Sequence, residues 1–356
     1  MQSILKDQIE TPALVIDMEA LEANIKKMAD FFVGKKAKLR PHFKTHKSPA
    51  IAHMQIAAGA KGITCAKLGE AEVLAAAGIK DILIANQIVD ERKLCRLAGI
   101  AKAARFGVCV DNAENVRALS EAAKAYGSTI CVLVEVDVGM GRCGVDTKEE
   151  VLALAKQIDR AEGLVFEGIQ SYAGQLSHRQ SKPDREKGVA EAVAKISAII
   201  DYLGQNGLSV NEVSGGSTGT HSITGDNTVW TEIQAGSYVF MDSDYEQLGL
   251  GFEQSMTILA TVIHKRPGVA VTDEGQKVCC QTMGSPPIKG YPGLTARLSE
   301  EHGTIADAED RLSYLQKLEY IPTHCCTTAN LHDDYYCVRK GLLESVLPVS
   351  ARGKAR

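Results

Sequence analysis

The sequence has few aromatic residues and no long apolar segment. Phe, Trp and Tyr make up 5% of its 356 residues, and there is a single Trp. The longest apolar runs, such as Ile130 to Val136, are far shorter than the ~20 residues that a membrane-spanning helix needs. The opening Met1-Gln2-Ser3 does not begin a signal peptide pattern. We therefore expect a soluble, cytoplasmic protein without a membrane partner.

An excess of basic residues is also missing. The chain has 40 Lys and Arg against 44 Asp and Glu, which gives a net charge of −4 at pH 7 and a pI near 6.2. Domains that bind nucleic acids usually carry a clear basic excess. We therefore expect no nucleic-acid partner.

The ten cysteines do not resemble a dense disulfide framework in a chain of this length. Most of them, such as Cys65 and Cys109, stand singly in apolar runs, where a buried thiol is the usual interpretation. The exceptions are the adjacent pairs Cys279-Cys280 and Cys325-Cys326, the second of which follows His324 directly. Adjacent cysteines rarely bond to each other, so the second pair, next to a histidine, is a candidate for metal binding.

A repeating pattern organises most of the chain: a short β-branched run, a loop with Gly, Asn or Asp, and then a segment of helical periodicity. The candidate strands are Lys38 to Lys44, Gly62 to Lys67, Asp81 to Gln87, Arg105 to Asp111, Thr129 to Asp137, Phe166 to Tyr172, Asn211 to Ser217 and Thr231 to Tyr238. Such alternation predicts an α/β fold of parallel strands and crossover helices. Eight strands predict a (β/α)8 barrel, with an open doubly wound sheet as the alternative.

The remaining segments predict a second, smaller domain. After Asp242 the pattern changes to alternating runs with one helical segment, Ala306 to Leu318, which is typical of a mostly antiparallel β domain. The runs are Thr257 to His264, Gly268 to Thr272 and Lys277 to Gln281. The strand-like segment from Thr11 to Asp17 has no vacant position in the barrel and is assigned here. We therefore predict a barrel over residues 18–243 and a β domain formed by residues 1–17 with 244–356.

The segment His42-Phe43-Lys44-Thr45-His46-Lys47 places a lysine between two histidines where the first predicted strand ends. Neighbouring cations such as Arg40, His46 and Lys47 would lower the pKa of the Lys44 amine, as a Schiff-base lysine requires. A solvated basic turn is the alternative for any short basic segment. Because the chemistry of a (β/α)8 barrel lies at the C-terminal ends of its strands, Lys44 is a candidate Schiff-base lysine.

Other predicted strand ends carry polar groups that suit such a lysine. One run ends in Asp137 to Arg142, and another ends in Gln170-Ser171-Tyr172 with His178 six residues further on. Two glycine-hydroxyl loops, Gly215 to Thr220 and Gly236 to Tyr238, offer amides and hydroxyls to a phosphate. One such loop alone is more often a turn. Two loops with a strand-end lysine predict a phosphate site.

Together these segments resemble the alanine racemase-like, fold-type III family of pyridoxal phosphate enzymes, and within it the D-threonine aldolase and D-serine dehydratase branch. The resemblance extends over nearly the whole chain. It rests on Thr11-Pro12, His42 to Lys47, Val138 to Gly144, Tyr172 to His178, Gly215 to Thr220, Glu300 to Gly303 and His324 to Cys326.

The resemblance implies where the cofactor would bind. Lys44 would hold pyridoxal phosphate as a Schiff base, Arg142 would lie near the phenolic oxygen of the cofactor, and Tyr172 would contact it. The phosphate would be held by Ser217, Thr218, Gly219, Thr220, Gly236, Ser237 and Tyr238. A plain structural cation is the alternative for Arg142, and core packing is the alternative for Tyr172.

A metal pair is expected in the second domain. His324 and Cys326 are separated by one residue, so on an extended segment both can reach one ion. Most such pairs are accidental, but the family carries a metal pair at this position, with cysteine in dehydratases and aspartate in typical D-threonine aldolases. The resemblance implies a divalent metal, Zn²⁺ or Mn²⁺, and a cysteine ligand favours zinc.

Two features of the resemblance favour different reactions. The segment from Tyr172 to His178 resembles the aldolases, in which the histidine and the metal activate the substrate hydroxyl for Cα–Cβ cleavage. Cys326 resembles the dehydratases, in which the lysine removes the α proton and zinc takes the hydroxyl as leaving group. Because His178 would act on the bond that breaks, we predict a lyase with Lys44 and His178 as catalytic residues. It would cleave D-β-hydroxy amino acids to glycine and an aldehyde, with D-serine or D-threo-3-hydroxyaspartate dehydration as the alternative.

Three other classes explain less of the sequence. A pyridoxal phosphate-binding protein without lyase activity would end after the barrel, and an amino-acid racemase would lack the His324-x-Cys326 pair. A Schiff-base aldolase without cofactor would need neither phosphate loop. Active sites of related barrels form near a subunit interface, so we expect a homodimer. The preferred substrate side chain stays open.

Overall fold

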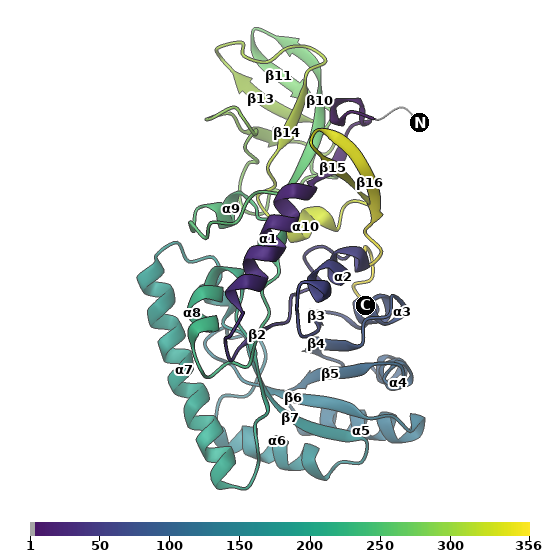
Figure 1. Ribbon diagram of the computed structural model, residues 1–356, viewed down its shortest axis with the longest axis vertical. Helices are drawn as coiled ribbons and strands as arrows, with labels where there is room; N and C mark the ends of the chain where they lie inside the picture. Colours follow the sequence, from purple (N-terminus) through teal and green to yellow (C-terminus); the bar gives the residue numbers. More distant parts are fainter. Residues whose placement is uncertain (1–3) are drawn as a thin grey trace. The chain divides into compact units, whose positions relative to one another are not determined.

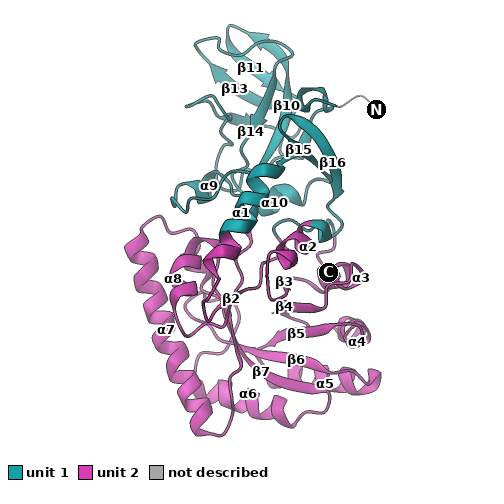
Figure 2. Cartoon of the chain, viewed as in Figure 1, with its two compact units in different colours: residues 1–27, 45–50, 237–353 teal, residues 28–44, 51–236, 354–356 magenta. Residues whose placement is uncertain are grey.

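The computed structural model describes residues 4–356 and divides the chain into two compact units, shown in Figure 2. Unit 1 consists of the chain up to Lys27 together with Thr45–Ala50 and Ser237–Gly353. Unit 2 consists of Met28–Lys44, Ile51–Gly236 and Lys354–Arg356. The chain therefore passes between the units five times. The domain boundaries expected from the sequence, a barrel of residues 18–243 and a β domain of residues 1–17 with 244–356, remain a prediction.

Unit 2 contains the predicted parallel barrel. Its eight strands are β2 (Lys38–Leu39), β3 (Ile63–Cys65), β4 (Asp81–Gln87), β5 (Arg105–Val110), β6 (Ile130–Glu135), β7 (Leu164–Ser171), β8 (Glu212–Gly215) and β9 (Glu232–Ile233). They pair in the order β2-β9-β8-β7-β6-β5-β4-β3. Beyond β2 the sheet closes on itself, because Thr64 donates its N–H to Pro41 and accepts the N–H of Phe43. The predicted fold class is confirmed.

Helices surround these strands, as Figure 1 shows. They are α2 (Pro49–Ala57), α3 (Leu68–Ala76), α4 (Glu91–Ile100), α5 (Ala113–Tyr126), α6 (Lys148–Arg160), α7 (Lys182–Gln205) and α8 (His221–Asp226), whereas α1 (Met18–Phe31) belongs mostly to unit 1. Local sequence sets several of their ends. Asp90 and Asn112 cap the first turns of α4 and α5 through their side chains, and Thr147 forms a capping box with Glu150. Gly127 ends α5 at a φ of 59°.

A network of ion pairs lies at the N-terminal ends of the barrel strands. Arg40 is 1% exposed and donates to Asp81 at 2.9 Å and to Glu232 at 2.8 Å. Arg105 also pairs with Asp81, at 2.8 Å. Burial raises the pKa of Asp81, but the hydrogen bonds and charges of the two arginines outweigh it and leave that pKa lowered. This end of the barrel is therefore an electrostatic structural layer.

A cluster of apolar side chains lies between the ion-pair layer and the C-terminal ends of the barrel strands. Leu83, Cys109 and Leu133 form a buried cluster on β4, β5 and β6. Because side chains two residues apart share a face of a strand, Asp111 and Glu135 point the same way as Cys109 and Leu133. The apolar cluster thus supports polar residues at the C-terminal ends of the strands.

Unit 1 is built on a second, mostly antiparallel sheet. Its strands are β1 (Ala13–Asp17), β10 (Met256–Arg266), β11 (Gly268–Thr272), β12 (Ala296–Leu298), β13 (Gly303–Asp307), β14 (Lys317–Tyr320), β15 (Asp334–Arg339) and β16 (Leu342–Pro348), with short helices α9 (Ser243–Glu246) and α10 (Cys325–Ala329). The order is β12-β13-β11-β10-β1-β15-β16, and β14 pairs with β10. The segment that had no position in the barrel, β1, lies in the middle of this sheet. It pairs antiparallel with β10 and parallel with β15.

Two segments of unit 1 differ from the sequence prediction. The expected strand from Lys277 to Gln281 is a turn, in which Val278 and Cys279 donate their N–H groups to Gly275. The expected helix from Ala306 to Leu318 is wrong. Strand β13 ends at Asp307, whose carboxylate accepts the N–H groups of Arg311 and Leu312 and so stabilises a turn instead of a helix.

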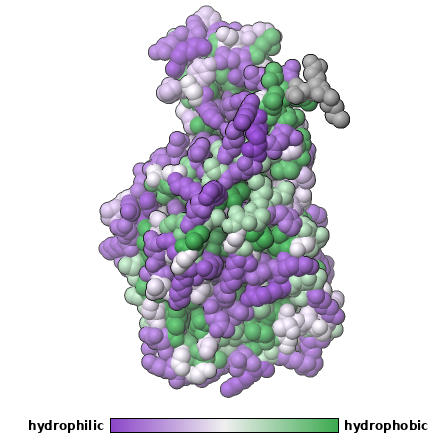
Figure 3. Space-filling view, in the orientation of Figure 1, coloured by the Kyte–Doolittle hydropathy of each residue, from purple (hydrophilic) through white to green (hydrophobic). Residues whose placement is uncertain are grey.

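Hydrophilic residues cover most of the face drawn in Figure 3, with hydrophobic residues between them. This agrees with amphipathic helices that turn one face to a sheet and the other to solvent. Across residues 4–356, we find no helix with the length and apolar character needed to cross a membrane.

Candidate active site

A cavity of about 190 Å³ lies at the C-terminal ends of the barrel strands. The cavity is lined by residues at or after the ends of five strands and by residues of the loop after β6. They are His42, Lys44, Ala66, Ala85, Asn86, Arg142, Cys143, Gln170, Tyr172 and Gln234. The structure thus brings together Lys44, Arg142 and Tyr172 from the predicted site residues. The amide side chains of Asn86, Gln170 and Gln234 also line the cavity but were not predicted as site residues. Asn86 and Gln170 lie near the ends of predicted strands.

Tyr172 lies near two cations of this cavity. The Lys44 Nζ atom is 5.9 Å from the centre of its ring, and the Arg142 guanidinium carbon is 5.5 Å from it. At these distances each cation meets the electron-rich face of the ring only weakly. The Tyr172 hydroxyl is 3.3 Å from the Ser177 hydroxyl. An aromatic wall flanked by an amine and a guanidinium suits a flat, anionic ligand.

The loop that carries Arg142 is held at both ends. The Asp137 carboxylate accepts the N–H groups of Gly139, Met140 and Gly141, at 2.7 to 3.2 Å. After Arg142, the Gly144 N–H donates to Asp111 at 3.2 Å. These bonds fix a loop that has no regular secondary structure of its own.

Two carboxylates, the buried Glu135 and the partly exposed Asp111, share one amide next to this loop. Gln87 Nε2 donates to Glu135 Oε2 at 2.6 Å and to Asp111 Oδ2 at 3.1 Å. Burial raises the pKa of Glu135, while the hydrogen bond from Gln87 and the charge of Arg142 oppose that rise. None of the three was predicted as a site residue, although Gln87 and Asp111 end predicted strands and Glu135 lies two residues before the end of another.

The first predicted phosphate loop follows β8 in unit 2. Ser217, Thr218 and Thr220 are buried, at 6%, 1% and 2% exposure. The Ser217 N–H donates to Thr220 Oγ1 at 3.2 Å, and Thr218–Thr220 forms a short 3-10 helix with Gly219 at its centre. Before it, Gly216 has a φ of 72°, and a Cβ there would come within 2.9 Å of Thr224 Oγ1. The chain therefore folds back tightly at this strand end, as a phosphate cradle requires.

The remaining residues of the prediction lie elsewhere. His178 follows a short 3-10 helix, Gly174–Leu176, and is half-buried; it is not among the described residues that line the Lys44 cavity. Gly236 ends the long segment of unit 2, whereas Ser237 and Tyr238 begin the last segment of unit 1. Tyr238 is fully buried, and its ring centre is 5.7 Å from that of Phe252.

His324 and Cys326 are neighbours at the start of α10 in unit 1. A hydrogen bond to Cys326 raises the pKa of His324, against the opposing effect of burial. The sulfur of Cys326 is 3.3 Å from Thr45 Oγ1 and 3.8 Å from Ser237 Oγ. Within residues 4–356 there is no set of three or more His, Cys, Asp or Glu side chains arranged for a metal ion. The pair thus offers two donors and leaves other coordination positions open.

Arg40, expected from the sequence to be a neighbouring cation of Lys44, has two carboxylate partners of its own. The guanidinium of Arg40 is bound by Asp81 and Glu232 in the structural layer at the opposite strand ends, so its charge is compensated there. Arg40 stabilises the barrel and is not a cation of the cavity.

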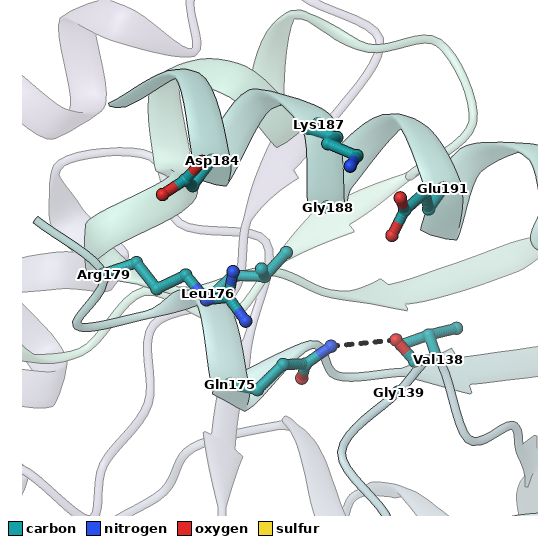
Figure 4. A pocket seen from close by; sticks show the side chains of 9 residues that line it. All are labelled: Val138, Gly139, Gln175, Leu176, Arg179, Asp184, Lys187, Gly188 and Glu191. Carbon is teal, nitrogen blue, oxygen red and sulfur yellow. Dashed lines mark hydrogen bonds between the residues drawn. The ribbon is translucent and has the colours of Figure 1, made fainter. Parts of the chain in front are cut away.

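A larger hollow of about 290 Å³ lies between α7 and the segment after Tyr172 (Figure 4). Arg179 and Gln175 form one side of it, and Asp184, Lys187 and Glu191 of α7 form the other. It contains none of the predicted site residues, and its charged side chains are exposed. We therefore take the smaller cavity around Lys44 as the candidate active site.

Comparison with known proteins identifies the family. The alanine racemase N-terminal domain family matches residues 16–244, and a putative serine dehydratase domain matches residues 255–338. The D-threonine aldolase of Arthrobacter sp is 41% identical over 360 residues, covering 98% of this chain and 94% of that protein. The 3-hydroxy-D-aspartate aldolase of Paracoccus denitrificans (strain Pd 1222) is 39% identical over 362 residues, with the same two shares.

Solved structures agree with these relatives. D-Threonine aldolase from Filomicrobium marinum superposes with a TM-score of 0.97 at 40% identity, covering 99% of this chain and 98% of that one. D-threo-3-Hydroxyaspartate dehydratase from Delftia sp. HT23 has a TM-score of 0.88 at 26% identity, covering 97% and 98%. Variants of this dehydratase have been solved with alanine in place of a histidine and in place of a cysteine two positions later, the second in a metal-free form. The chain belongs to the fold-type III family of pyridoxal phosphate lyases that includes the D-threonine and 3-hydroxy-D-aspartate aldolases and the related D-amino acid dehydratases.

Proposed function

We propose that this protein cleaves D-configured β-hydroxy α-amino acids between Cα and Cβ, giving glycine and an aldehyde. The observation that carries the proposal is the match to two aldolases at 39% and 41% identity over 98% of the chain, which includes both units. The substrate is a small D-amino acid, and threonine and 3-hydroxyaspartate are the two side chains named by these relatives.

The residues of the cavity fit pyridoxal phosphate. Lys44 is the lysine among the lining residues, and no carboxylate is among them to repel an anionic cofactor. The Tyr172 ring provides a flat wall and Arg142 a cation. The tight backbone at Gly216 and the buried hydroxyls of Ser217, Thr218 and Thr220 suit the phosphate. We assign Gly219, Gly236, Ser237 and Tyr238 to the same phosphate site by family resemblance.

Each residue then has a defined task. When bound, pyridoxal phosphate supplies an electron sink for the electron pair left at Cα by bond cleavage. The Lys44 amine would bind the aldehyde carbon of the cofactor, and Arg142 would donate hydrogen bonds to its phenolic oxygen. Tyr172 would shield the ring from water. His178 would accept the proton of the substrate β-hydroxyl, since loss of that proton drives the C–C cleavage.

His324 and Cys326 fit a divalent cation as a pair of adjacent imidazole and thiol donors. Water and substrate oxygens would complete the coordination, as at catalytic zinc sites with open positions. A cation held there would act as a Lewis acid on the β-hydroxyl. The metal-free dehydratase variant that lacks a cysteine two positions after a histidine supports this assignment. The thiol ligand favours Zn²⁺ over Mn²⁺.

Cys326 also favours a second candidate function, dehydration to a 2-oxo acid and ammonia. The D-threo-3-hydroxyaspartate dehydratase of Delftia sp. is 30% identical over 351 residues. In that reaction Lys44 would remove the α proton and the β-hydroxyl would leave. The higher identity to the aldolases makes cleavage our first proposal.

The products decide between the two reactions. The purified protein with pyridoxal phosphate and Zn²⁺ or Mn²⁺ is given D-threonine or 3-hydroxy-D-aspartate, with L-threonine as the control. We expect glycine with acetaldehyde or glyoxylate, and no product after Lys44→Ala. Lys38→Ala, a change at the exposed start of the same strand, should keep the activity. A 2-oxo acid with ammonia would establish the dehydratase instead, and the absence of all these products would refute both proposals.

Assembly and location complete the proposal. We propose a homodimer, because related barrels form their active sites near a subunit interface, and a cytoplasmic protein. Both stay predictions.

A further inference from the structure

Glu135 combines burial, charge and proximity to the candidate cofactor site. It is the last residue of β6 and is 5% exposed. Its Oε1 atom lies 3.8 Å from Arg142 Nη2, and its Oε2 atom accepts the hydrogen bond from Gln87 at 2.6 Å. One carboxylate oxygen is thus held by a fixed neighbour, and the other faces the cation of the cavity.

The two partners of this ion pair differ in burial and in the element that carries them. The Arg142 side chain is 51% exposed and extends from a loop, whereas Glu135 is fixed at the end of a barrel strand. A buried charge is screened less by salt and water than an exposed one. At 3.8 Å the pair is too long for a hydrogen bond, so the carboxylate attracts the guanidinium without immobilising it.

The anchoring of the loop leaves the Arg142 side chain as its adjustable part. Val145 N–H donates to the Glu135 carbonyl at 2.9 Å and Gly144 N–H to Asp111, so the backbone after Arg142 is bound to the same two strand ends. The direction of the guanidinium then depends on what attracts it. Within the described residues, the ion pair of this arginine is with Glu135, and its aromatic contact is with Tyr172.

We propose that Glu135 is a positioning residue that holds the Arg142 guanidinium over the Tyr172 ring, directed at an anionic oxygen of the bound cofactor. The inference rests on the proposed binding of pyridoxal phosphate in this cavity. Glu135 itself does not touch the cofactor and acts through Arg142. Gln87 and Asp111 assist by keeping the Glu135 carboxylate in place.

Glu135→Gln tests this role without removing volume. The new amide oxygen can still accept the hydrogen bond from Gln87, but its NH₂ group presents donors to the arginine. We expect the melting temperature to stay close to that of the wild-type holoenzyme. We expect cofactor affinity, measured as free pyridoxal phosphate after dilution of the holoenzyme, to fall roughly three- to tenfold, since ion pairs near a surface contribute modestly.

A double-mutant cycle separates a positioning role from a direct one. Arg142→Ala should weaken cofactor binding at least as much as Glu135→Gln, and the double variant should be no worse than Arg142→Ala alone. Glu135→Asp should recover part of the affinity because it restores the charge. Glu162→Gln is the matched control, since it removes an exposed glutamate that pairs with Lys124 at 2.7 Å on the surface.

The outcomes are distinguishable. Equal affinity of Glu135→Gln and wild type, with a clear defect in Arg142→Ala, would overturn the role of Glu135 and leave the proposed cofactor site intact. Additive losses in the double variant would show that Glu135 does not act through Arg142, and would also overturn it. If Arg142→Ala bound pyridoxal phosphate as tightly as the wild type, Arg142 would not contribute to cofactor binding, and the proposed role of Glu135 would be overturned as well.

Discussion

At the scale of single residues, strand alternation decides which side chains meet in the barrel. Arg40, directly after β2, joins the ion pairs at the N-terminal ends of the strands, whereas Lys44, four residues later in a turn, lines the cavity at the other end. The same face of β5 carries Arg105 at its start and Asp111 after its end. Charged residues on one face of a strand therefore lie in different surroundings, the structural ion-pair layer at one end and the candidate active site at the other.

Glu274 is a buried carboxyl group in unit 1, and it is unusual because neither of its oxygens has a hydrogen-bond partner of good geometry. Burial raises its pKa to about 8, against the pull of Cys279, and the charge of Asp273 adds to the rise. In the unfolded chain the pKa returns to near 4.5. Between pH 4.5 and about 8, Glu274 therefore holds a proton in the folded protein that it has lost in the unfolded chain.

Ionisation of Glu274 should therefore lower the free energy of unfolding by up to ~5 kcal/mol between pH 4.5 and 8, with no further change from this group above pH 8. Glu274→Gln cannot lose a proton, so its stability relative to wild type should rise with pH in that window. Urea denaturation at pH 5, 6.5 and 8 measures the difference, and Glu300→Gln, at an exposed position, is the control. A difference that is the same at all three values would contradict the prediction.

At the scale of elements, a bulge in β7 depends on one glycine. Leu133 pairs with Gly168 while Val132 pairs with Phe166, so Glu167 is an extra residue in the strand. Gly168 has a φ of 154°, and a Cβ there would lie 1.9 Å from the backbone oxygen of Glu212 on β8. The close approach of the two backbones requires glycine at this position.

Gly168→Ala should lower the free energy of unfolding by about 2 kcal/mol or more, because the neighbouring backbone must move to admit a methyl group. Gly204→Ala is a matched control in α7, where an added Cβ would meet no atom within 4 Å. That change should raise stability by about 0.5–1 kcal/mol, as alanine replaces glycine in a helix. Equal melting temperatures of the two variants would be evidence against the bulge as described.

The sequence was sufficient for elements whose local pattern and tertiary environment agree. The boundaries of β4 and β11 match the prediction, and all eight barrel strands were found. The segment from Ala306 to Leu318 failed because its helical pattern competes with side-chain hydrogen bonds from Asp307 that only the folded chain reveals. The roles of Gln87 and Glu135 were missed because each depends on a partner from another strand. Lys44, Arg142 and Tyr172 could be considered together from the sequence because each follows a strand, and in the structure they line one cavity; their roles stay a prediction.

At the scale of the whole molecule, the sheet of unit 1 depends on a strand from the opposite end of the chain. β1 lies between β10 and β15, and its Ala13, Leu14, Val15 and Ile16 are buried. Ile9, Ala13 and Val15 pack with Leu259 and Val338 in one cluster. Without β1 the two halves of the sheet would lose the strand that joins them.

A fragment of residues 237–353 should therefore remain unfolded by itself. Adding a synthetic peptide of residues 9–20 should restore β structure, which circular dichroism and resistance to protease would measure. The same peptide with Val15→Lys is the control, because a charge at this buried position opposes docking. A fragment that folds without any peptide would contradict the central role of β1.

The position of β1 also affects how the protein is made. Ile16 pairs with Met256, 240 positions further along, and with Cys337 later still. At a synthesis rate of ~5–20 residues per second, β1 leaves the ribosome roughly 12–50 s before its first partner strand exists. Throughout that interval an apolar strand with two unpaired edges is exposed to other nascent chains. Chaperone binding to the first twenty residues during translation would protect the cell from aggregates that the finished protein does not form.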